Sequence, residues 1–500
     1  MDPGPLVVPL EMYIGIDIGT TATKAILIDG EQKLLASATA AYEVASLVPG
    51  YAEQDPSQWI SVFKNVLKQL NALSPTYYKA VRRIGFSGQM HSLVALDEKF
   101  RPIRPALLWN DGRGREQCKQ ITSLIPHVEN LTGAVAMPSF TAAKLLWLKQ
   151  NETQNFAALR HIVLPKDFVR HWLCGEVATD HSDAAGTQLY DQASRQWSDD
   201  MLGLVGLATS ALPIIRESHE SIGKLQKHVA DELGLSPDVV VCTGGGDTPV
   251  GSIGMGCVSP GDSIVSLGTS GHLSIVTDGY QPTTGGCLHN FAHAAPRQWF
   301  RMGALLNGAS CLAWAASLVG VEDIGALLQQ VEARFKGPSR VLFLPYLSGE
   351  RTPHNNTDLR GALLGLDGAT DKYDIAQAVL EGVAFSLADA RDAMKLNVAT
   401  TVPHFIGGGA RSSLWSVIIA SVLNMKLATH RDADFGPSLG AARLAMLGEA
   451  GADRSDILTK PEIKSIVEPR SDLVDAYAEK HVRYRRAFAG VAEYAEENAG

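Results

Sequence analysis

The stretch that decides the fold is Tyr13-Ile14-Gly15-Ile16-Asp17-Ile18-Gly19-Thr20-Thr21-Ala22-Thr23-Lys24-Ala25-Ile26-Leu27-Ile28-Asp29. Isoleucine-rich runs on both sides of a polar centre predict two buried strands joined by a tight turn. Gly19 lets the backbone turn and approach a ligand closely, and the hydroxyls of Thr20 and Thr21 can donate hydrogen bonds. Asp17 ends the first strand and faces whatever the turn holds. Phosphate oxygens with a hydrated Mg²⁺ fit these groups, although an ordinary hairpin with a polar turn would have the same sequence pattern.

The length and composition predict two large domains of a globular protein. The chain has 500 residues, of which 45% are hydrophobic and 19% are charged. That is too long for one hydrophobic core and apolar enough to bury two. The formal net charge is −9 and no long basic run occurs, so we expect neither nucleic acid nor an anionic membrane as a partner.

The cysteines and the N-terminus indicate a cytoplasmic protein. Six cysteines are scattered without a C-x-x-C pair, which is typical of reduced thiols and argues against disulfides and a zinc site. The apolar runs are far shorter than a membrane span. Residues 1–11 have three prolines and no basic start, so they predict a disordered extension and not a signal peptide.

A second stretch repeats the design of the first. Residues Ser263 to Ile275 again read as strand, turn and strand, with Gly268, Thr269 and Ser270 in the turn. This repeat predicts an internal duplication of one α/β unit. Two such hairpins facing each other across a cleft could hold a nucleoside triphosphate. The turn at 258–262 is the expected boundary between the domains.

Several other predicted strands end in polar or glycine-rich segments. In the first half these segments are Met90-His91 and Asn110-Asp111. His91 could also be an ordinary core or surface histidine, and Asn110-Asp111 could be turn residues. Three glycines precede Asp247 and Thr248 at the start of a helix, so this carboxylate can come very close to a small ligand. Ligands of open α/β sheets bind at such strand ends.

The second half is expected to supply a nucleotide site and several helices. A helix is predicted to open at Gly303-Ala304-Leu305-Leu306-Asn307-Gly308-Ala309-Ser310. A strand, the turn at Gly408-Gly409 and a helix start predict a place for a base or ribose. Further helices are expected at 374–398 and at about 472–488, the latter after a polar linker.

Two long patterns in the right order resemble the FGGY carbohydrate kinases over residues 12 to about 488. The first pattern is met at 139–151, and the second at 361–366, 374–375 and 378–381. Within that family the chain is similar to bacterial members that act on D-xylulose. The stretches that carry this similarity are Gly88-Gln89-Met90-His91, Leu108-Trp109-Asn110-Asp111-Gly112-Arg113, Leu164-Pro165-Lys166-Asp167 and residues 346–356.

The resemblance implies two ribonuclease-H-like domains of the actin/hexokinase/Hsp70 ATPase type, with a central cleft. Their expected ranges are 12–258 for sugar binding and catalysis and 259–450 for the nucleotide, followed by a linker, a C-terminal helix and a tail over 451–500. The resemblance also implies ATP-dependent phosphorylation of D-xylulose at its 5-hydroxyl, with Mg²⁺. A homodimer is left open.

The resemblance assigns roles residue by residue. Asp247 matches the catalytic base, and Met90 and His91 match the sugar-binding pair, to which Asn110, Asp111 and Thr248 are expected to add contacts. Asp17 matches the carboxylate that faces Mg·ATP, with Asp247 as a second metal-facing group. Phosphate contacts are expected from Thr20, Thr21, Gly268, Thr269 and Ser270, and adenosine contacts from Gly308, Gly408 and Gly409. Relatives often have Asn where this chain has Thr248, which leaves the choice of sugar open.

Two alternatives are kept. One is a family kinase for another neutral sugar or polyol, such as ribulose or sedoheptulose. Gluconate is disfavoured because a carboxylated substrate calls for a basic residue near the sugar. The other is an actin- or Hsp70-like ATPase switch, which would not need Met90-His91 at a strand end.

Overall fold

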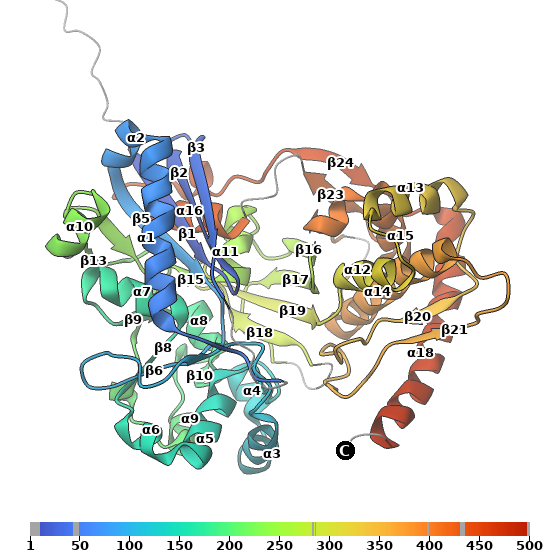
Figure 1. The fold of residues 1–500 in the computed structure, drawn as a ribbon, viewed down its shortest axis with the longest axis horizontal. Helices are drawn as coiled ribbons and strands as arrows, with labels where there is room; N and C mark the ends of the chain where they lie inside the picture. Colours follow the sequence, from blue (N-terminus) through green and yellow to red (C-terminus); the bar gives the residue numbers. More distant parts are fainter. Residues whose placement is uncertain are drawn as a thin grey trace, which may run out of the picture.

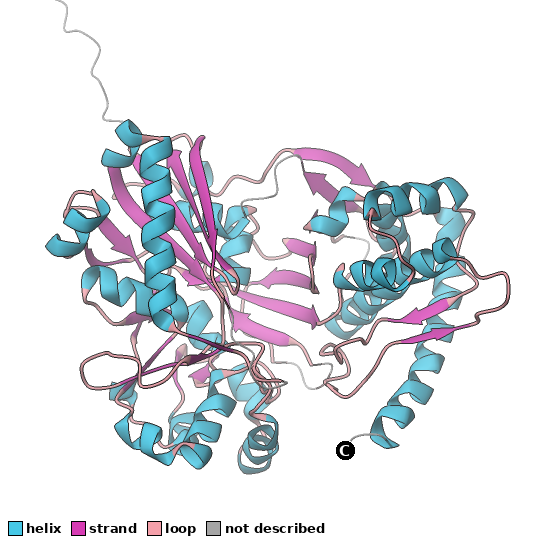
Figure 2. Ribbon diagram, viewed as in Figure 1, coloured by secondary structure: helices cyan, strands magenta, loops and turns pink. Residues whose placement is uncertain are grey.

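The computed structural model describes residues 11–43, 50–282, 285, 287–397, 400–430 and 436–497. Two α/β bodies lie side by side, each built on a seven-stranded sheet (Figure 1). Figure 2 shows that helices cover both sheets. The predicted extension at 1–11 lies outside the described residues except for Glu11.

The first sheet contains the predicted opening hairpin. It has the order β13-β14-β5-β1-β2-β3, with β15 beside β5. β1, β2 and β3 run antiparallel, whereas β5 and β14 run parallel to β1. The strands are β1 (Met12–Ile18), β2 (Ala22–Asp29), β3 (Leu34–Ala41), β5 (Val81–Gly88), β13 (Ser221–Lys224), β14 (Val240–Cys242) and β15 (Gly245–Gly246).

The second sheet repeats the core of the first. Its order is β18-β19-β17-β16-β22-β23-β24, in which β19-β17-β16-β22-β23 matches β3-β2-β1-β5-β14 in order and direction. The predicted internal duplication is therefore confirmed. The strands are β16 (Ser263–Leu267), β17 (Gly271–Thr277), β18 (His289–Ala292), β19 (Trp299–Leu305), β22 (His404–Ile406), β23 (Leu427–His430) and β24 (Ile463–Val467).

The first long helix beside the first sheet buries one apolar face. α1 (Pro56–Leu73) begins at the capping carboxylate of Asp55 and buries Trp59, Phe63 and Leu70, as its periodicity predicts. α7 (Pro165–Cys174), α10 (Lys227–Leu233) and α11 (Asp247–Gly254) follow along the chain.

α16 (Gly436–Leu447) returns from the second half of the sequence to the first sheet. It packs on β1, β5 and α11. A Cβ on Gly15 would lie 2.0 Å from the Ser438 carbonyl oxygen, and one on Gly85 would lie 1.8 Å from that of Ala441. Only glycine allows this close approach of a helix to a sheet. The range 259–450 thus contributes one helix to the first body.

The second body carries α12 (Ser310–Leu318), α13 (Ile324–Arg334), α14 (Lys372–Met394), α15 (Ser413–Leu423) and α18 (Ser471–Glu497). The helix predicted to open at Gly303 was wrong, because Gly303–Leu305 pair with β17 as the end of β19 and the helix begins at Ser310. A short apolar run fits a strand and a buried helix equally well. The predicted linker includes α17 (Arg454–Ile457) and β24, so it is not free of structure.

The remaining elements lie mainly below the first sheet in the view of Figure 1. No described helix is long and apolar enough to cross a membrane. These elements are α2 (Pro75–Lys79), α3 (Arg115–Leu124), α4 (Val128–Thr132), α5 (Thr141–Asn151), α6 (Thr153–Ala158), α8 (His181–Gly186), α9 (Asp199–Val205), η1 (Thr209–Ala211), η2 (Gly408–Arg411), β4 (Glu53–Gln54), β6 (Val94–Leu96), β7 (Ala106–Leu107), β8 (His161–Val163), β9 (Ala178–Asp180), β10 (Tyr190–Asp191), β11 (Gln196–Trp197), β12 (Ile214–Arg216), β20 (Leu342–Leu344) and β21 (Ala362–Leu364).

Candidate active site

A cavity of about 320 Å³ lies where the two bodies meet. The first body lines it with Met90, His91, Asp247 and Thr248, and the second with Thr269 and Ser270. Residues more than 170 positions apart in the sequence thus share one cavity, as the expected cleft between two domains requires. The cavity has a volume suited to a ligand of the size of a sugar, and polar groups line it on several sides.

Asp247 stands at the start of α11, directly after β15. Its Oδ1 accepts hydrogen bonds from the backbone N–H of Thr248 at 2.7 Å and from the Thr248 hydroxyl at 3.4 Å. Burial, and then the nearby charge of Asp17, raise the pKa of Asp247 to about 7. A carboxylate with such a pKa can take up a proton near neutral pH, which an ordinary aspartate does poorly.

Asp17 lies near the end of β1, opposite Lys24 on β2 and Ser87 on β5. Its Oδ1 accepts a hydrogen bond from the Ser87 hydroxyl at 2.8 Å. Burial raises the pKa of Asp17, while that hydrogen bond and the charge of Lys24 lower it. Asp17 and Asp247 are therefore two buried acids close enough to repel each other, so ionising both of them without a cation is unfavourable.

These two carboxylates suit a magnesium ion better than a metal that needs three or more protein ligands. Magnesium prefers a few carboxylate oxygens and keeps water and phosphate as its other ligands. A divalent cation beside Asp17 and Asp247 would also relieve the repulsion that raises the pKa of Asp247. Within the described residues, no group of three or more His, Cys, Asp or Glu side chains could hold a metal by itself.

The two glycine turns form the expected pair of hairpins. Thr20, in the β1–β2 turn, accepts a hydrogen bond from the indole N–H of Trp109 at 2.8 Å, and Thr21 is exposed. In the β16–β17 turn Thr269 and Ser270 are exposed beside Gly268. The second turn rests on the start of α12, because Ala309 N–H donates to the Gly268 carbonyl at 2.7 Å.

Gly308 is needed for that contact. A Cβ at this position would lie 2.4 Å from the carbonyl oxygen of Ser270, which no side chain tolerates. Gly308 therefore shapes the β16–β17 turn, and its neighbour Ala309 lines a separate cavity of about 560 Å³ between α12, α13 and α15. Gly408 also lines that cavity, whereas Gly409 packs against Leu267.

His91 is a neutral hydrogen-bonding group in the small cavity. It has a left-handed backbone with φ +68°, and burial lowers its pKa to about 3. Its Nδ1 lies 2.7 Å from the Gly186 carbonyl oxygen, so Nδ1 carries the proton and Nε2 is the acceptor. Lys144 Nζ and the Thr141 hydroxyl donate to the backbone carbonyl of His91 at 2.9 and 3.0 Å, which fixes the turn.

Asn110 and Asp111 lie in an adjoining cavity of about 580 Å³ and do not line the first one. The Asp111 carboxylate accepts hydrogen bonds from Ala52 N–H at 2.7 Å and from the Arg113 guanidinium at 2.8 Å. Both of its oxygens are thus used inside the protein. The predicted contacts of these two residues with sugar stay a prediction.

Arg351 is the main residue that the sequence reasoning missed. Its side chain lines both cavities, and its guanidinium lies over the Trp109 ring at 5.5 Å from the centroid. Gluconate was disfavoured because it calls for a basic residue near the sugar, and Arg351 places a basic side chain on the cavity that Met90 and His91 line. A signal was present, because Arg351 belongs to a polar loop directly after a strand. His272 and His289 also line the small cavity and carried no such signal.

Comparisons with known proteins cover nearly the whole chain. Residues 12–254 match the N-terminal domain, and residues 264–449 the C-terminal domain, of the FGGY family of carbohydrate kinases. The chain is 38% identical over 479 residues to the xylulose kinase of Klebsiella pneumoniae, covering 96% of this chain and 99% of that protein.

Two solved structures share the fold. The xyloylose kinase of Brucella ovis has a TM-score of 0.91 at 40% identity. The match covers 97% of this chain and 100% of the Brucella chain. The gluconate kinase of Lactobacillus acidophilus has a TM-score of 0.90 at 25% identity. The match covers 98% of this chain and 100% of the Lactobacillus chain. These likenesses and the repeated sheet confirm the predicted pair of ATPase-type α/β domains.

Proposed function

The chain belongs to the FGGY family of carbohydrate kinases, and we propose that it transfers the γ-phosphoryl group of ATP to the 5-hydroxyl of D-xylulose. Nearly full-length similarity to curated xylulose kinases supports this choice of sugar. The observation that carries the proposed chemistry is the position of Asp247. This acid, with a pKa of about 7, lines one cavity together with His91 and the turn residues Thr269 and Ser270.

Asp247 is the proposed general base. As the sugar 5-oxygen attacks the γ-phosphorus, its O–H bond breaks and the proton goes to an Asp247 carboxylate oxygen. A new O–P bond forms, the bond from the γ-phosphorus to the bridging oxygen breaks, and ADP leaves with that oxygen. An acid whose pKa lies near the working pH suits this task, because it is ionised before the reaction and still basic enough to accept the proton.

Met90 and His91 are the proposed sugar contacts. His91 offers an acceptor nitrogen, since its other nitrogen donates to Gly186. Met90 supplies apolar surface against the carbon chain of the sugar. A neutral histidine is suited to hydroxyl groups, and its low pKa means that it keeps this character throughout the physiological range.

The phosphate groups are proposed to lie between the two turns. Backbone N–H groups and hydroxyls of Thr20, Thr21, Thr269 and Ser270 can donate to phosphate oxygens. Asp17 would hold the magnesium ion with Asp247 beside it, and the ion when bound would neutralise phosphate charge. The 560 Å³ cavity between α12, α13 and α15, which Gly408 lines, is the proposed adenosine site.

Because of Arg351, carboxylated sugars should be tested as a second class of phosphoryl acceptor. Its guanidinium faces the sugar cavity, so a carboxylated sugar such as gluconate has a basic partner there. D-Xylulose has no such group, and for this sugar Arg351 is proposed to face the phosphoryl group. An ATPase switch of the actin type is not supported by membership of a carbohydrate kinase family.

The cellular location is proposed from the chemistry of the cysteines. We propose that the enzyme works in the cytosol, where ATP is plentiful and thiols stay reduced, since its six cysteines are all free. A homodimer stays a prediction.

The test is an assay of sugar-dependent ADP release. D-Xylulose, D-ribulose, L-ribulose, sedoheptulose and gluconate are compared as acceptors, with ATP and Mg²⁺ in excess. D-Xylulose is expected to give the highest kcat/KM. A higher kcat/KM for gluconate would mean that gluconate, and not D-xylulose, is the substrate. ADP release at the same rate with and without every sugar tested would contradict the assignment as a sugar kinase.

A further inference from the structure

The proposed base Asp247 follows three glycines, which have no side chains to contact their neighbours. Gly244, Gly245 and Gly246 precede it, and there is no room for side chains there. A Cβ on Gly245 would lie 3.0 Å from the Ser182 hydroxyl oxygen, and one on Gly246 would lie 2.6 Å from Met90 Cγ. The position of Asp247 must therefore be fixed by groups outside the segment.

Ser182 supplies such a group. The backbone N–H of Gly246 donates to the Ser182 hydroxyl oxygen at 3.0 Å, and that hydroxyl donates to Asp180 Oδ2 at 2.5 Å. A hydroxyl has a single proton, so donation to Asp180 turns its lone pairs toward Gly246. Gly246 is the residue directly before Asp247, so the chain of hydrogen bonds ends one residue before the proposed base.

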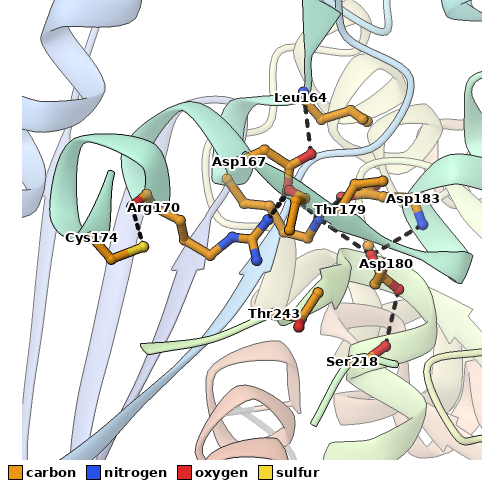
Figure 3. A network of polar contacts seen from close by, with 12 residues as sticks. Leu164, Asp167, Arg170, Cys174, Thr179, Asp180, Asp183, Ser218 and Thr243 are labelled. Atoms are coloured by element: carbon orange, nitrogen blue, oxygen red, sulfur yellow. Dashed lines mark hydrogen bonds and ion pairs between the residues drawn. The ribbon is translucent and has the colours of Figure 1, made fainter. Parts of the chain in front are cut away.

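Asp180 is itself held by buried charges (Figure 3). Its carboxylate accepts from the Ser218 hydroxyl at 3.0 Å and lies 3.2 Å from Lys166 Nζ. Lys166 also pairs with Asp167 at 2.8 Å and Asp183 at 2.7 Å, and all these side chains are buried. Burial raises the pKa of Asp180, but the Lys166 charge and the serine hydrogen bonds bring it below the ordinary value, so Asp180 is ionised at neutral pH.

The same short helix also reaches the sugar site. α8 begins at the Asp180 cap, contains Ser182 and ends at Gly186, whose carbonyl accepts the His91 Nδ1–H. One end of α8 thus supports the base and the other supports the sugar-binding histidine. A buried charged network of this kind resists rearrangement, because breaking one of its ion pairs leaves an uncompensated charge.

We propose that Ser182 is a positioning residue for Asp247: Asp180 and Lys166 anchor the Ser182 hydroxyl, which fixes Gly246 and so aims the carboxylate at the sugar hydroxyl. This inference rests on the proposed role of Asp247 as the base. It adds that the buried Lys166 network serves the rate of reaction as well as the stability of the fold.

The chain offers a matched control for the test. Ser182 and Ser218 both donate to Asp180 Oδ2, but only Ser182 also accepts from Gly246. Ser182→Ala and Ser218→Ala therefore remove the same kind of bond from the same carboxylate. Ser182→Cys and Ser218→Cys, which keep the side-chain shape and weaken the hydrogen bond, serve if an alanine variant fails to fold.

The measurements are kcat, the KM for ATP, the melting temperature and the pH profile of kcat. Ser182→Ala is expected to lower kcat roughly 10- to 100-fold, because a small misplacement of a reacting group is that costly. The KM for ATP should not change, and Ser218→Ala should keep kcat within about threefold at a similar melting temperature. Ser182→Thr, which restores a hydroxyl, is expected to recover most of the rate.

Two results would overturn the inference. The first is an unchanged kcat in Ser182→Ala, and the second is an equal loss of kcat in both variants with no recovery in Ser182→Thr, which would mean a structural role alone. Asp247→Asn is measured in parallel. If that variant keeps normal turnover, the proposed base is wrong; if it is inactive while Ser182→Ala is normal, only the positioning role fails.

Discussion

Replacing the base Asp247 with asparagine should abolish turnover and at the same time stabilise the protein. The substitution keeps the shape of the side chain and removes its charge and its basicity. The loss of a general base lowers kcat by roughly 100- to 10,000-fold. ATP binding should be largely intact, because the contacts proposed for adenosine and phosphate come from other residues.

The gain in stability follows from the raised pKa. The pKa of Asp247 rises from an ordinary 3.8 to about 7. Folding thus favours the protonated form, and the wild-type protein loses stability as pH rises from about 4 through 7, where the unfolded chain is already ionised. At about 1.4 kcal/mol per pH unit the loss reaches up to about 4 kcal/mol, as an upper bound, and the neutral asparagine avoids it.

The assay compares melting temperatures of the wild type and Asp247→Asn between pH 4.5 and pH 8, without nucleotide or Mg²⁺. The difference in favour of the variant should be small at pH 4.5 and grow until about pH 7 to 8. Asp231→Asn, which neutralises an exposed residue on α10, is the control and should show no such trend. A variant that is equally or less stable than the wild type at pH 8 would refute the reasoning on the buried charge.

Three further predictions concern the neighbours of the base. Asp17→Asn should lower the pKa of Asp247, since one repelling charge is gone, so Asp247→Asn should raise the melting temperature at pH 8 by less in an Asp17→Asn background than in the wild type, without nucleotide or Mg²⁺; an equal rise in both backgrounds would mean that the two acids are not coupled. His91→Ala should raise the KM for the sugar by roughly tenfold or more and leave the KM for ATP unchanged, in line with the loss of a buried hydrogen bond, whereas an effect on ATP alone would contradict its assignment. Gly308→Ala should raise the KM for ATP, because its Cβ would lie 2.4 Å from the Ser270 carbonyl oxygen. Sugar binding, measured by calorimetry, should not change. An unchanged KM for ATP would show that glycine is not needed at this position.

Much of the fold could be predicted because its decisive features are local. The two hairpins are set by apolar runs on both sides of a glycine turn, and the structure repeats them with the same sheet order. Asp247 could be singled out because three glycines before a carboxylate have few other uses.

The rest depended on contacts between distant residues. The packing of α16 on the first sheet requires small residues such as Gly15, Gly85 and Ala441, and nothing in the local sequence says which sheet they meet. The end of β19 was mistaken for a helix because pairing with β17 decided its form. Arg351 and the Ser182 hydrogen bond reach the site from loops and a short helix whose positions only the folded chain defines.

The central claim is that Asp247 drives phosphoryl transfer from ATP to one hydroxyl of D-xylulose. The most direct measurement follows the reaction of ATP, Mg²⁺ and D-xylulose by ³¹P and ¹³C NMR, with the wild type and Asp247→Asn side by side. We expect the wild type to form one product with phosphorus coupled to carbon 5, at one ADP per product, and the variant to form almost none. Phosphate released to water at the same rate without sugar, phosphorylation at another carbon, or an active Asp247→Asn enzyme would contradict the account.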